Sequence, residues 1–223
     1  MKLLPVFILL AIATTATAQS SLSINAAFNN ALPEFSTTDD EKSGYASNGW
    51  AATVEYNYNF TPIVHFGAGL MLANNPLKVE TLQQELEDTY GINFNVSGKS
   101  YLATGLFIYP GINLPFSSQF QLFVAPLCGI FSISHPDIDI TSTVVNASQV
   151  GDNAITFLYG AQGGVALFTD NVGMRFTMRY LTGNIQYNDV LISANGLTER
   201  NDIEQQYSTL QFSIGIVFPL GGQ

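Results

Sequence analysis

The sequence predicts an all-β protein, an eight-stranded antiparallel up-and-down β-barrel that crosses a membrane. Three observations predict this class. Eight segments alternate bulky apolar residues with small or polar ones at a period of two, which is typical of strands with two different faces. Short turns and long loops alternate between these segments, so all the long loops fall at one end of an antiparallel meander. Few charged residues lie within the segments themselves.

The first 18 residues have the pattern of a secretory signal peptide. Lys2 precedes an apolar run, and Ala16-Thr17-Ala18 forms a small-residue site, so we expect export by a Sec-type route and cleavage after Ala18. A membrane-anchor helix is the alternative interpretation. The signal peptide is favoured because the apolar run is too short to span a bilayer. We expect residues 19–223 to form a single barrel domain.

Composition excludes some function classes. With Lys2 removed, six basic and 17 acidic residues remain. Nucleic acid is therefore not expected as a partner, because binding phosphates requires a basic surface. Cys128 is the only cysteine and lies in an apolar strand, so we expect a buried, inert thiol rather than a nucleophile or a disulfide.

The expected strands follow the period-two pattern along the chain. They cover 21–29, a hairpin over 48–73 with its corner at Thr61-Pro62, then 99–109, 119–132, 154–169, 172–184 and 207–220. The other short connections are expected at 110–118 and 170–171, and the long loops at 30–47, 74–98, 133–153 and 185–206. Pro126 indicates a bulge or kink within its strand. The strand at 99–109 is apolar on both faces, so its orientation stays open.

The two faces of the strands indicate the environment of the barrel. One face is bulky and apolar, and the other carries mainly Gly, Ala, Ser, Thr, Asn and Gln, which suit a narrow interior. The bulky face must then be the outside, which is tolerable only in lipid. The residues that we expect to face lipid include Trp50, Val54, Phe66, Leu70, Phe176, Ile214 and Phe218. A secreted, soluble barrel of the lipocalin sort, with the apolar face inward, is the alternative.

Four ionisable residues fall on the interior face of the strands: Glu55, His65, Arg175 and Arg179. We expect Glu55 to pair with Arg175 or Arg179 across the lumen, because an unpaired buried charge is costly. A charge network that fills the lumen is one interpretation of this set, and a gate or a proton-linked pore is the other.

The long loops hold 15 of the 17 acidic residues, so one end of the molecule is strongly negative. Carboxylates at Asp39, Asp40 and Glu41, and at Asp137 and Asp139, are weak candidate ligands for Ca²⁺ or Mg²⁺. A solvated acidic rim is the alternative interpretation.

Residues near 76–89 are expected to form one short helix in the second loop. Asn75 is the expected N-cap, Pro76 suits the first turn, and Gly91 can end the helix. Its apolar stripe predicts a helix that rests on the barrel rim, with binding of a partner as the alternative.

Enzymatic chemistry is not expected. His135 lies near Ser132, Ser134 and Asp137, but such residues are common in loops. The sequence has no zinc-ligand spacing, no phosphate-binding glycine loop and no nucleophile elbow, and it predicts no cofactor.

On these features the chain resembles the OmpA/OmpX-like eight-stranded outer-membrane β-barrels, including the barrel-domain proteins common in Bacteroidota. The resemblance covers the mature chain, including the last strand. In members of this family, the barrel-assembly machinery recognises a terminal aromatic residue of that strand, and Phe218 matches it. The five residues after Phe218 depart from the family pattern. It implies short turns in the periplasm and long loops outside the cell. It also implies contact with outer-membrane lipids and lipopolysaccharide. The acidic loops predict a bridge through divalent ions to the anionic lipopolysaccharide.

The function predicted from these observations is that of an integral outer-membrane protein. Its role is structural or adhesion-like, through the acidic extracellular loops and an unidentified partner. The alternative is a barrel through which a small molecule passes, or in which an apolar ligand binds.

Overall fold

The computed structural model describes residues 19–37, 44–117, 119–169 and 171–220. The predicted signal peptide and the residues Asp39, Asp40 and Glu41 lie outside the described residues. Among the described residues, no helix has both the length and the apolar character needed to cross a membrane. The elements are β1 (Gln19–Ala31), α2 (Pro33–Ser36), β2 (Gly49–Asn59), β3 (Val64–Asn75), α3 (Val79–Tyr90), β4 (Phe94–Gly98), β5 (Tyr101–Pro115), β6 (Phe120–Ser134), β7 (Ile138–Ser142), β8 (Asn146–Val150), β9 (Asn153–Phe168), β10 (Gly173–Ala194) and β11 (Leu197–Pro219).

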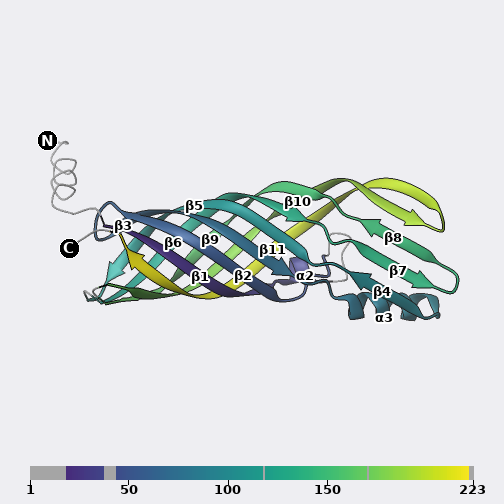
Figure 1. The fold of residues 1–223 in the computed structure, drawn as a ribbon, viewed down its shortest axis with the longest axis horizontal. Helices are drawn as coiled ribbons and strands as arrows, with labels where there is room; N and C mark the ends of the chain where they lie inside the picture. The colour runs from purple at the N-terminus through teal and green to yellow at the C-terminus, as the bar shows by residue number, and fades with distance from the viewer. Residues whose placement is uncertain (1–18, 38–43, 118, 170, 221–223) are drawn as a thin grey trace.

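Eight of the strands close into a ring (Figure 1). Their order is β1, β2, β3, β5, β6, β9, β10, β11, and every pair of neighbours is antiparallel. The last strand pairs with β10 on one side and with β1 on the other, where Leu22 lies opposite Phe218. Closure leaves no unpaired edge in the barrel wall. The predicted eight-stranded up-and-down barrel is confirmed.

Side chains alternate between the outer surface and the lumen along each barrel strand. On β2, Trp50 is 50% exposed, whereas its neighbour Ala51 is 2% exposed. Glu55 is also 2% exposed, although it is charged, because it points into the lumen. The other residues predicted for the outer face are all exposed there: Val54, Phe66, Leu70, Phe176, Ile214 and Phe218. The outer wall is therefore an apolar band, and small, polar and some aromatic residues fill the centre.

The strand that the sequence could not orient is β5. Leu106 and Ile108 are exposed on its outer face, while Tyr101, Phe107 and Tyr109 are buried in the lumen. Both faces are apolar because the lumen of this barrel contains aromatic rings as well as small residues. Period alone cannot distinguish the two faces of such a strand.

The prediction of a loop over 185–206 was wrong, because β10 and β11 continue as a hairpin far beyond the ring. The turn between them is Asn195-Gly196, with φ angles of 50° and 85°. A positive φ at both central residues defines the two-residue turn for which Asn-Gly is the preferred pair. Buried Ile185 and Tyr187 carry the strand pattern into the region assigned to the loop.

The loop predicted over 133–153 contains a second unpredicted hairpin, formed by β7 and β8. Strand β8 pairs with the outer part of β10, and β7 pairs with β4. The sheet β10–β8–β7–β4 therefore projects beyond one end of the barrel, where Figure 1 also places α3. We call β4, β7, β8, α3 and the β10–β11 hairpin beyond Tyr187 the loop-end extension.

The predicted helix is confirmed, but its predicted N-cap was wrong. Helix α3 begins at Val79, with Lys78 at the N-cap position. Asn75 ends β3 instead, and its Nδ2 donates a hydrogen bond to the Ser47 carbonyl oxygen at 2.8 Å. The helix ends at Gly91, as predicted, in the left-handed conformation that favours glycine (φ 67°). The short helix α2 was not predicted.

The ladder between β5 and β6 has one interruption. Ile108 pairs with Cys128 and Ile112 pairs with Val124, but no pairs form between these two. The register is the same on both sides of the gap, so Pro110 lies opposite Pro126 at its centre. Proline has no backbone N–H and cannot contribute a ladder bond. Pro126 therefore interrupts one ladder and inserts no extra residue, so the predicted bulge is absent.

Candidate functional site

Glu55 is the centre of a buried polar network inside the barrel. Its Oε1 accepts a hydrogen bond from Arg179 Nη2 at 2.5 Å, and its Oε2 lies 3.5 Å from Arg175 Nη1. The hydroxyl of Tyr109 donates to Oε2 at 2.7 Å, and that of Thr53 donates to Oε1 at 2.9 Å. The structure thus brings together three of the four predicted lumen residues.

The two arginines differ in how firmly they are held. Arg179 donates from Nε and Nη2 to Gln162 Oε1, at 2.9 and 2.7 Å, and its guanidinium lies over the Phe107 ring. Arg175 lies with its guanidinium 3.8 Å from the centre of the Phe123 ring, and Glu55 is its one ion-pair partner among the described residues. Arg179 is therefore anchored by hydrogen bonds, whereas Arg175 is held mainly by packing and by charge.

Strand geometry explains this convergence. Residues four apart on a strand share a face, so Arg175 and Arg179 both point inward from β10. Glu55 points inward from β2, and its partner on β3 is Gly69, which has no side chain to crowd it. A Cβ at Gly69 would lie 2.5 Å from Phe107 Cζ and 3.0 Å from Glu55 Cγ. A larger residue at this position would therefore displace the network.

His65, the fourth predicted residue, adjoins the network without a hydrogen bond to it. Its ring packs edge-on against Tyr109, with 6.0 Å between ring centroids. Its Nδ1 is buried and has no hydrogen-bond partner among the described residues. Sequence reasoning did not include Tyr109, Thr53 and Gln162 in this site. The period-two pattern is the signal for them, because it puts Thr53 and Gln162 on inward faces of their strands and does the same for Tyr109 once β5 is oriented.

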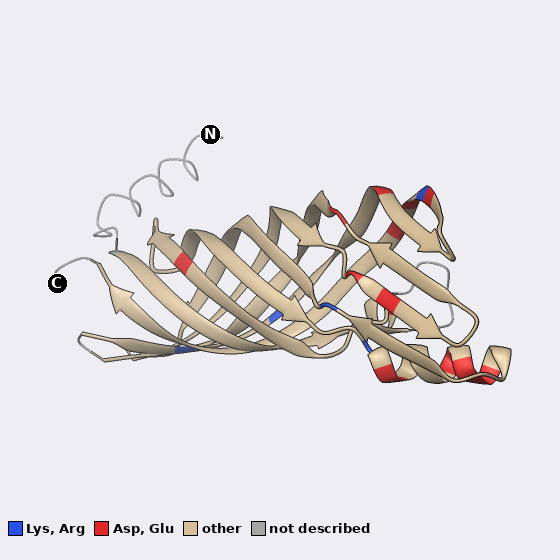
Figure 2. Ribbon diagram, turned by 45° about the vertical axis from the view of Figure 1, so that its right-hand side comes forward, with Lys and Arg blue, Asp and Glu red and all other residues tan. Residues whose placement is uncertain are grey.

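Most acidic residues of the described chain lie at the loop end of the molecule (Figure 2). Asp137 accepts a hydrogen bond from Lys99 Nζ at 2.6 Å, and its Oδ1 accepts one from the Gly151 N–H at 3.1 Å. The hydrogen bond from Lys99 holds the pKa of the Asp137 carboxyl below its usual range. In the described part of the chain, Asp137 and Asp139 belong to no group of three or more potential metal ligands.

His135 connects the elements of the extension. One ring nitrogen, Nδ1, lies 2.8 Å from the Pro136 carbonyl oxygen, and Nε2 lies 3.2 Å from Gln149 Nε2. The ring packs edge-on against Tyr187 of β10 at 4.8 Å. Burial lowers the pKa of His135. Both nitrogens have contacts: Nδ1 with the adjacent Pro136 within the β6–β7 connection, and Nε2 with Gln149 of β8. The geometry here is therefore that of a structural histidine.

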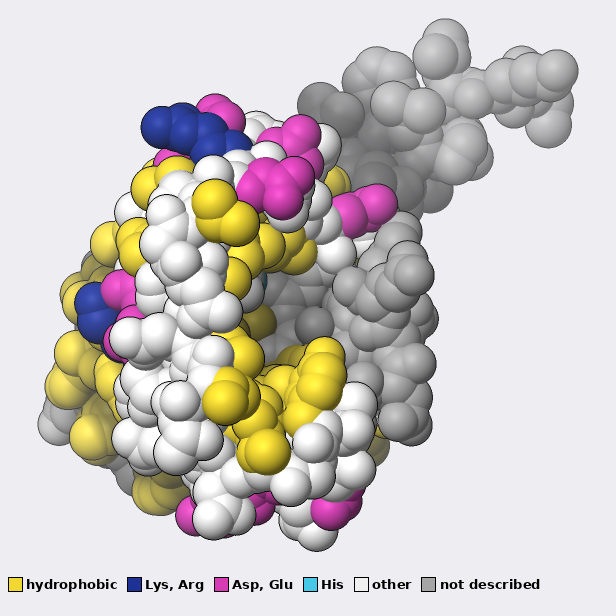
Figure 3. Space-filling view, turned by 90° about the vertical axis from the view of Figure 1, so that its right-hand side faces the viewer, with side chains coloured by type: hydrophobic (Ala, Val, Ile, Leu, Met, Phe, Trp, Pro, Cys, Tyr) yellow, Lys and Arg dark blue, Asp and Glu magenta, His cyan; other side chains and the backbone are white. Residues whose placement is uncertain are grey.

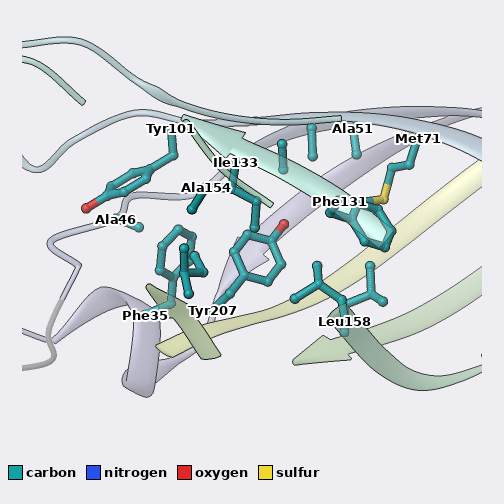
Figure 4. Close-up of a cluster of buried hydrophobic side chains, with 14 of the residues drawn as sticks. Phe35, Ala46, Ala51, Met71, Tyr101, Phe131, Ile133, Ala154, Leu158 and Tyr207 are labelled. Atoms are coloured by element: carbon teal, nitrogen blue, oxygen red, sulfur yellow. The ribbon is translucent and has the colours of Figure 1, made fainter. Parts of the chain in front are cut away.

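An aromatic cluster fills the barrel at the level where the extension begins (Figure 4). Phe35 of α2 is fully buried between Tyr101 and Tyr207, with ring centroids 5.0 and 4.9 Å apart. The hydroxyl of Tyr101 donates to the Gly44 carbonyl oxygen at 2.7 Å and accepts from Gln205 Nε2 at 3.0 Å. The lumen is thus filled at two levels, by this cluster and by the Glu55 network.

Seen from the loop end, acidic side chains lie around the edge and apolar ones gather toward the centre (Figure 3). Several large apolar side chains of the extension are strongly exposed: Tyr90 at 65%, Val144 at 65% and Leu197 at 80%. These residues lie in the part of the molecule that projects beyond the ring.

The closed ring with an apolar outer wall and a polar, filled lumen defines a transmembrane-type β-barrel of eight strands. Its fold is similar to that of solved outer-membrane β-barrels. A major outer membrane protein from Thermus thermophilus matches 90% of this chain and 99% of its own, with a TM-score of 0.51 and 10% identity. This likeness shows the shared fold.

Other solved structures align at lower scores. Neisserial surface protein A matches 89% of this chain and 96% of its own, with a TM-score of 0.47 and 12% identity. Ail, the attachment invasion locus protein of Yersinia pestis, matches 91% of this chain and all of its own, with a TM-score of 0.46 and 14% identity. Ail has also been solved in complex with the heparin analogue sucrose octasulfate. No family model and no curated protein sequence matches the chain.

Proposed function

We propose that the chain is an integral outer-membrane barrel that presents the loop-end extension as a surface for contact with a partner outside the cell. The observation that carries this proposal is the contrast between the two ends of the molecule. One end has short turns, whereas the other continues into ordered strands and a helix. The Thermus protein of the same fold is an outer-membrane protein, which supports this location.

The extension has the physical properties of an interaction surface. Its backbone is ordered by ladders that continue from the barrel, so binding a partner costs little conformational entropy. The extension carries exposed apolar residues, including Val144 and Leu197, and exposed carboxylates, such as Asp189 and Asp202. Apolar contact area with an acidic surround favours a partner with a basic rim.

The barrel itself provides anchorage. Its apolar band faces the lipids of the outer membrane, and lipopolysaccharide surrounds the base of the extension. Residues 1–18 direct export, and the barrel-assembly machinery inserts the chain, with Phe218 near the end of β11 as the aromatic residue of its recognition signal.

Cell fractionation together with gel mobility tests the location. A folded barrel kept in cold detergent should migrate differently from the boiled protein and should fractionate with outer membranes. Recovery of a detergent-free soluble protein would contradict the proposal and support a secreted barrel.

A deletion tests the interaction surface. Replacing Ile138–Val150 by a short turn removes β7 and β8, yet leaves all eight ring strands in place. Cells that display the wild-type barrel should bind a cationic surface, such as polylysine-coated glass, more than cells that display the deletion. A matched control replaces Ile63, which is exposed in the short turn between β2 and β3 at the opposite end, by Ser and should leave adhesion unchanged. Equal adhesion by the wild type and the deletion variant would contradict the proposed role.

Passage of a small molecule is the second candidate. The lumen is filled by the Glu55 network and the Phe35 cluster, which argues against an open pore. Single-channel conductance in planar bilayers distinguishes the two functions, because the anchor proposal predicts no sustained current.

A further inference from the structure

The tip of the β10–β11 hairpin is an Asn-Gly pair that lies outside the ladders of the extension. Ala194 and Leu197 are the last residues that pair between the two strands, so Asn195 and Gly196 form the turn beyond them. Both turn residues have positive φ angles, and both are exposed. A Cβ placed on Gly196 would meet no atom within 4 Å. The backbone at Gly196 is therefore unhindered on the side where any other residue would carry a side chain.

An Asn-Gly pair is a sequence that reacts with itself. The backbone nitrogen of the glycine attacks Cγ of the asparagine side chain, a five-membered succinimide ring closes, and the side-chain nitrogen leaves as ammonia. Water then opens the ring at either carbonyl, which gives aspartate or isoaspartate. Glycine favours the first step because it has no Cβ to hinder the approach of its nitrogen.

The side chain of Asn195 is held in a way that assists this attack. Its Oδ1 accepts a hydrogen bond from the Asn146 N–H at 3.0 Å. Negative charge develops on Oδ1 as Cγ becomes tetrahedral, and a fixed N–H donor stabilises such a charge. No described residue accepts a hydrogen bond from the departing nitrogen, Nδ2. The oxygen that must become charged is therefore supported, and the leaving nitrogen is not held in place.

A second Asn-Gly pair, Asn48-Gly49, provides a comparison within the same chain. Asn48 Oδ1 also accepts a hydrogen bond from a backbone N–H, that of Ala31 at 3.2 Å. Gly49, however, is the first residue of β2 and belongs to the ladder with β1. A Cβ on Gly49 would collide with the Asn74 carbonyl oxygen of β3. The Gly49 nitrogen cannot turn toward Cγ without disturbing the barrel wall, whereas the Gly196 nitrogen has no ladder to leave.

We propose that Asn195 is a site of spontaneous modification, at which the Gly196 nitrogen converts the asparagine into isoaspartate or aspartate. The bond from Gly196 N to Cγ forms as the bond from Cγ to Nδ2 breaks. Ammonia carries away Nδ2 together with the proton of the Gly196 N–H, and water supplies the oxygen of the new carboxylate. The reaction needs only water, and it depends on the fold of the extension and not on its role as an interaction surface.

Isoaspartate changes the hairpin tip in two ways. It routes the backbone through the former side chain, which adds one carbon to a turn whose geometry is specific for two residues. It also adds a carboxylate to the tip. Asn195 makes two hydrogen bonds with Asn146, one through Oδ1 and one from its own N–H to the Asn146 carbonyl oxygen at 2.9 Å. Both depend on the original turn, so the modified tip should separate from the start of β8.

The test uses the full mature barrel, folded in detergent and incubated at pH 8.5 in water enriched in oxygen-18. Peptide mass spectrometry should find the label at position 195 and roughly tenfold less at position 48, because only the second reaction must disturb a ladder. In urea, where neither pair is folded, the two sites should react at similar rates. Asn195→Gln should block labelling at position 195, since attack on the longer side chain would form a six-membered ring.

Hydrogen exchange at the Asn146 amide measures the effect on the tip. Exchange should become roughly tenfold faster after modification, because the acceptor on Asn195 has moved. Asn195→Asp is the matched control. It carries the added charge and still offers a side-chain oxygen to Asn146, but it has no extra backbone carbon, so the Asn146 amide should stay protected.

Each outcome decides the proposal. Absence of label at position 195 in the folded barrel overturns the site, and equal labelling at positions 48 and 195 overturns the role of the unhindered glycine. Unchanged exchange at Asn146 after modification overturns the effect on the tip, and equally fast exchange in Asn195→Asp overturns the role of the added carbon. Heat-modifiable gel mobility, measured on every sample, separates these results from unfolding of the barrel.

Discussion

Replacing Glu55 by Gln keeps the size of this side chain but removes the one buried carboxylate that faces two arginines. In the wild type, Arg179 Nη2 lies 2.5 Å from Glu55 Oε1, and Arg175 Nη1 lies 3.5 Å from Glu55 Oε2. The variant leaves both buried cations without an acidic partner. Removing one partner of a buried ion pair typically costs about 3–5 kcal/mol. We expect Glu55→Gln to lower the free energy of unfolding by an amount in this range.

The two arginines provide an internal ranking. Arg179→Met removes three hydrogen bonds, two to Gln162 and one to Glu55, so it should cost nearly as much as Glu55→Gln. Arg175→Met removes a longer ion pair and should cost less. In the double variant Glu55→Gln/Arg179→Met, the loss should be smaller than the sum of the two single losses, because each single variant leaves the other charge unpaired.

Urea titration of barrels refolded into lipid vesicles measures these losses, with tyrosine or tryptophan fluorescence and gel mobility as independent readouts. Glu199→Gln, in the exposed hairpin of the extension, is the matched control and should change the free energy of unfolding by less than about 0.5 kcal/mol. A Glu55→Gln variant as stable as this control would refute the reasoning, because the network would then contribute nothing to the fold.

Three further predictions concern the outer wall, the lumen and the extension. Ile214→Arg puts a charge on the outer wall and should cost about 2–4 kcal/mol if the residue lies near the bilayer midplane, whereas Leu197→Arg at the tip should cost almost nothing; vesicle refolding of both variants measures the difference. Gly69→Val forces a side chain against Phe107 and Glu55 and should cost about 1–3 kcal/mol in the same titration. Ala68→Val, at the outward-facing neighbour, is the control. A smaller cost for Gly69→Val than for this control would contradict the close packing of Gly69 against Phe107 and Glu55. Burial lowers the pKa of His135 in the folded protein, so His135 in the unfolded chain binds a proton at a higher pH. The extension should therefore lose stability as pH falls below the pKa of about 6.5 for histidine in the unfolded chain. Limited proteolysis at pH 7.5 and 5.5 checks this, and His135→Gln should remove the pH dependence.

Sequence pattern was sufficient for the ring and for its sidedness. Alternation of bulky and small residues determines which face of β2 and β3 is outward, since a shift of one residue would reverse every side chain. The pattern failed on β5, where Tyr101, Phe107 and Tyr109 fill the lumen. Tyr109 is inside because its hydroxyl reaches Glu55 and Asn57, a contact between strands that are distant in sequence.

The loop-end extension was predicted least well. Length and acidity indicated loops over 185–206 and 133–153, although Asn195-Gly196 is a strong hairpin signal in the first of these. The short strands β4, β7 and β8 have little pattern of their own, and they are strands because β10 extends far enough to pair with β8. The gap at Pro110 and Pro126 follows from their common register, which no single strand reveals.

The length of the β10–β11 ribbon has a mechanical consequence. The two strands have 22 and 23 residues, and at about 3.3 Å per residue each spans roughly 70 Å. A pull on the outer tip, as flowing liquid would exert on an attached cell, runs along the strand direction into the same backbone that carries Arg175 and Arg179. Many hydrogen bonds between β10 and β11 share such a load at the same time, and they do not break one by one. The ribbon should therefore behave as a stiff tether.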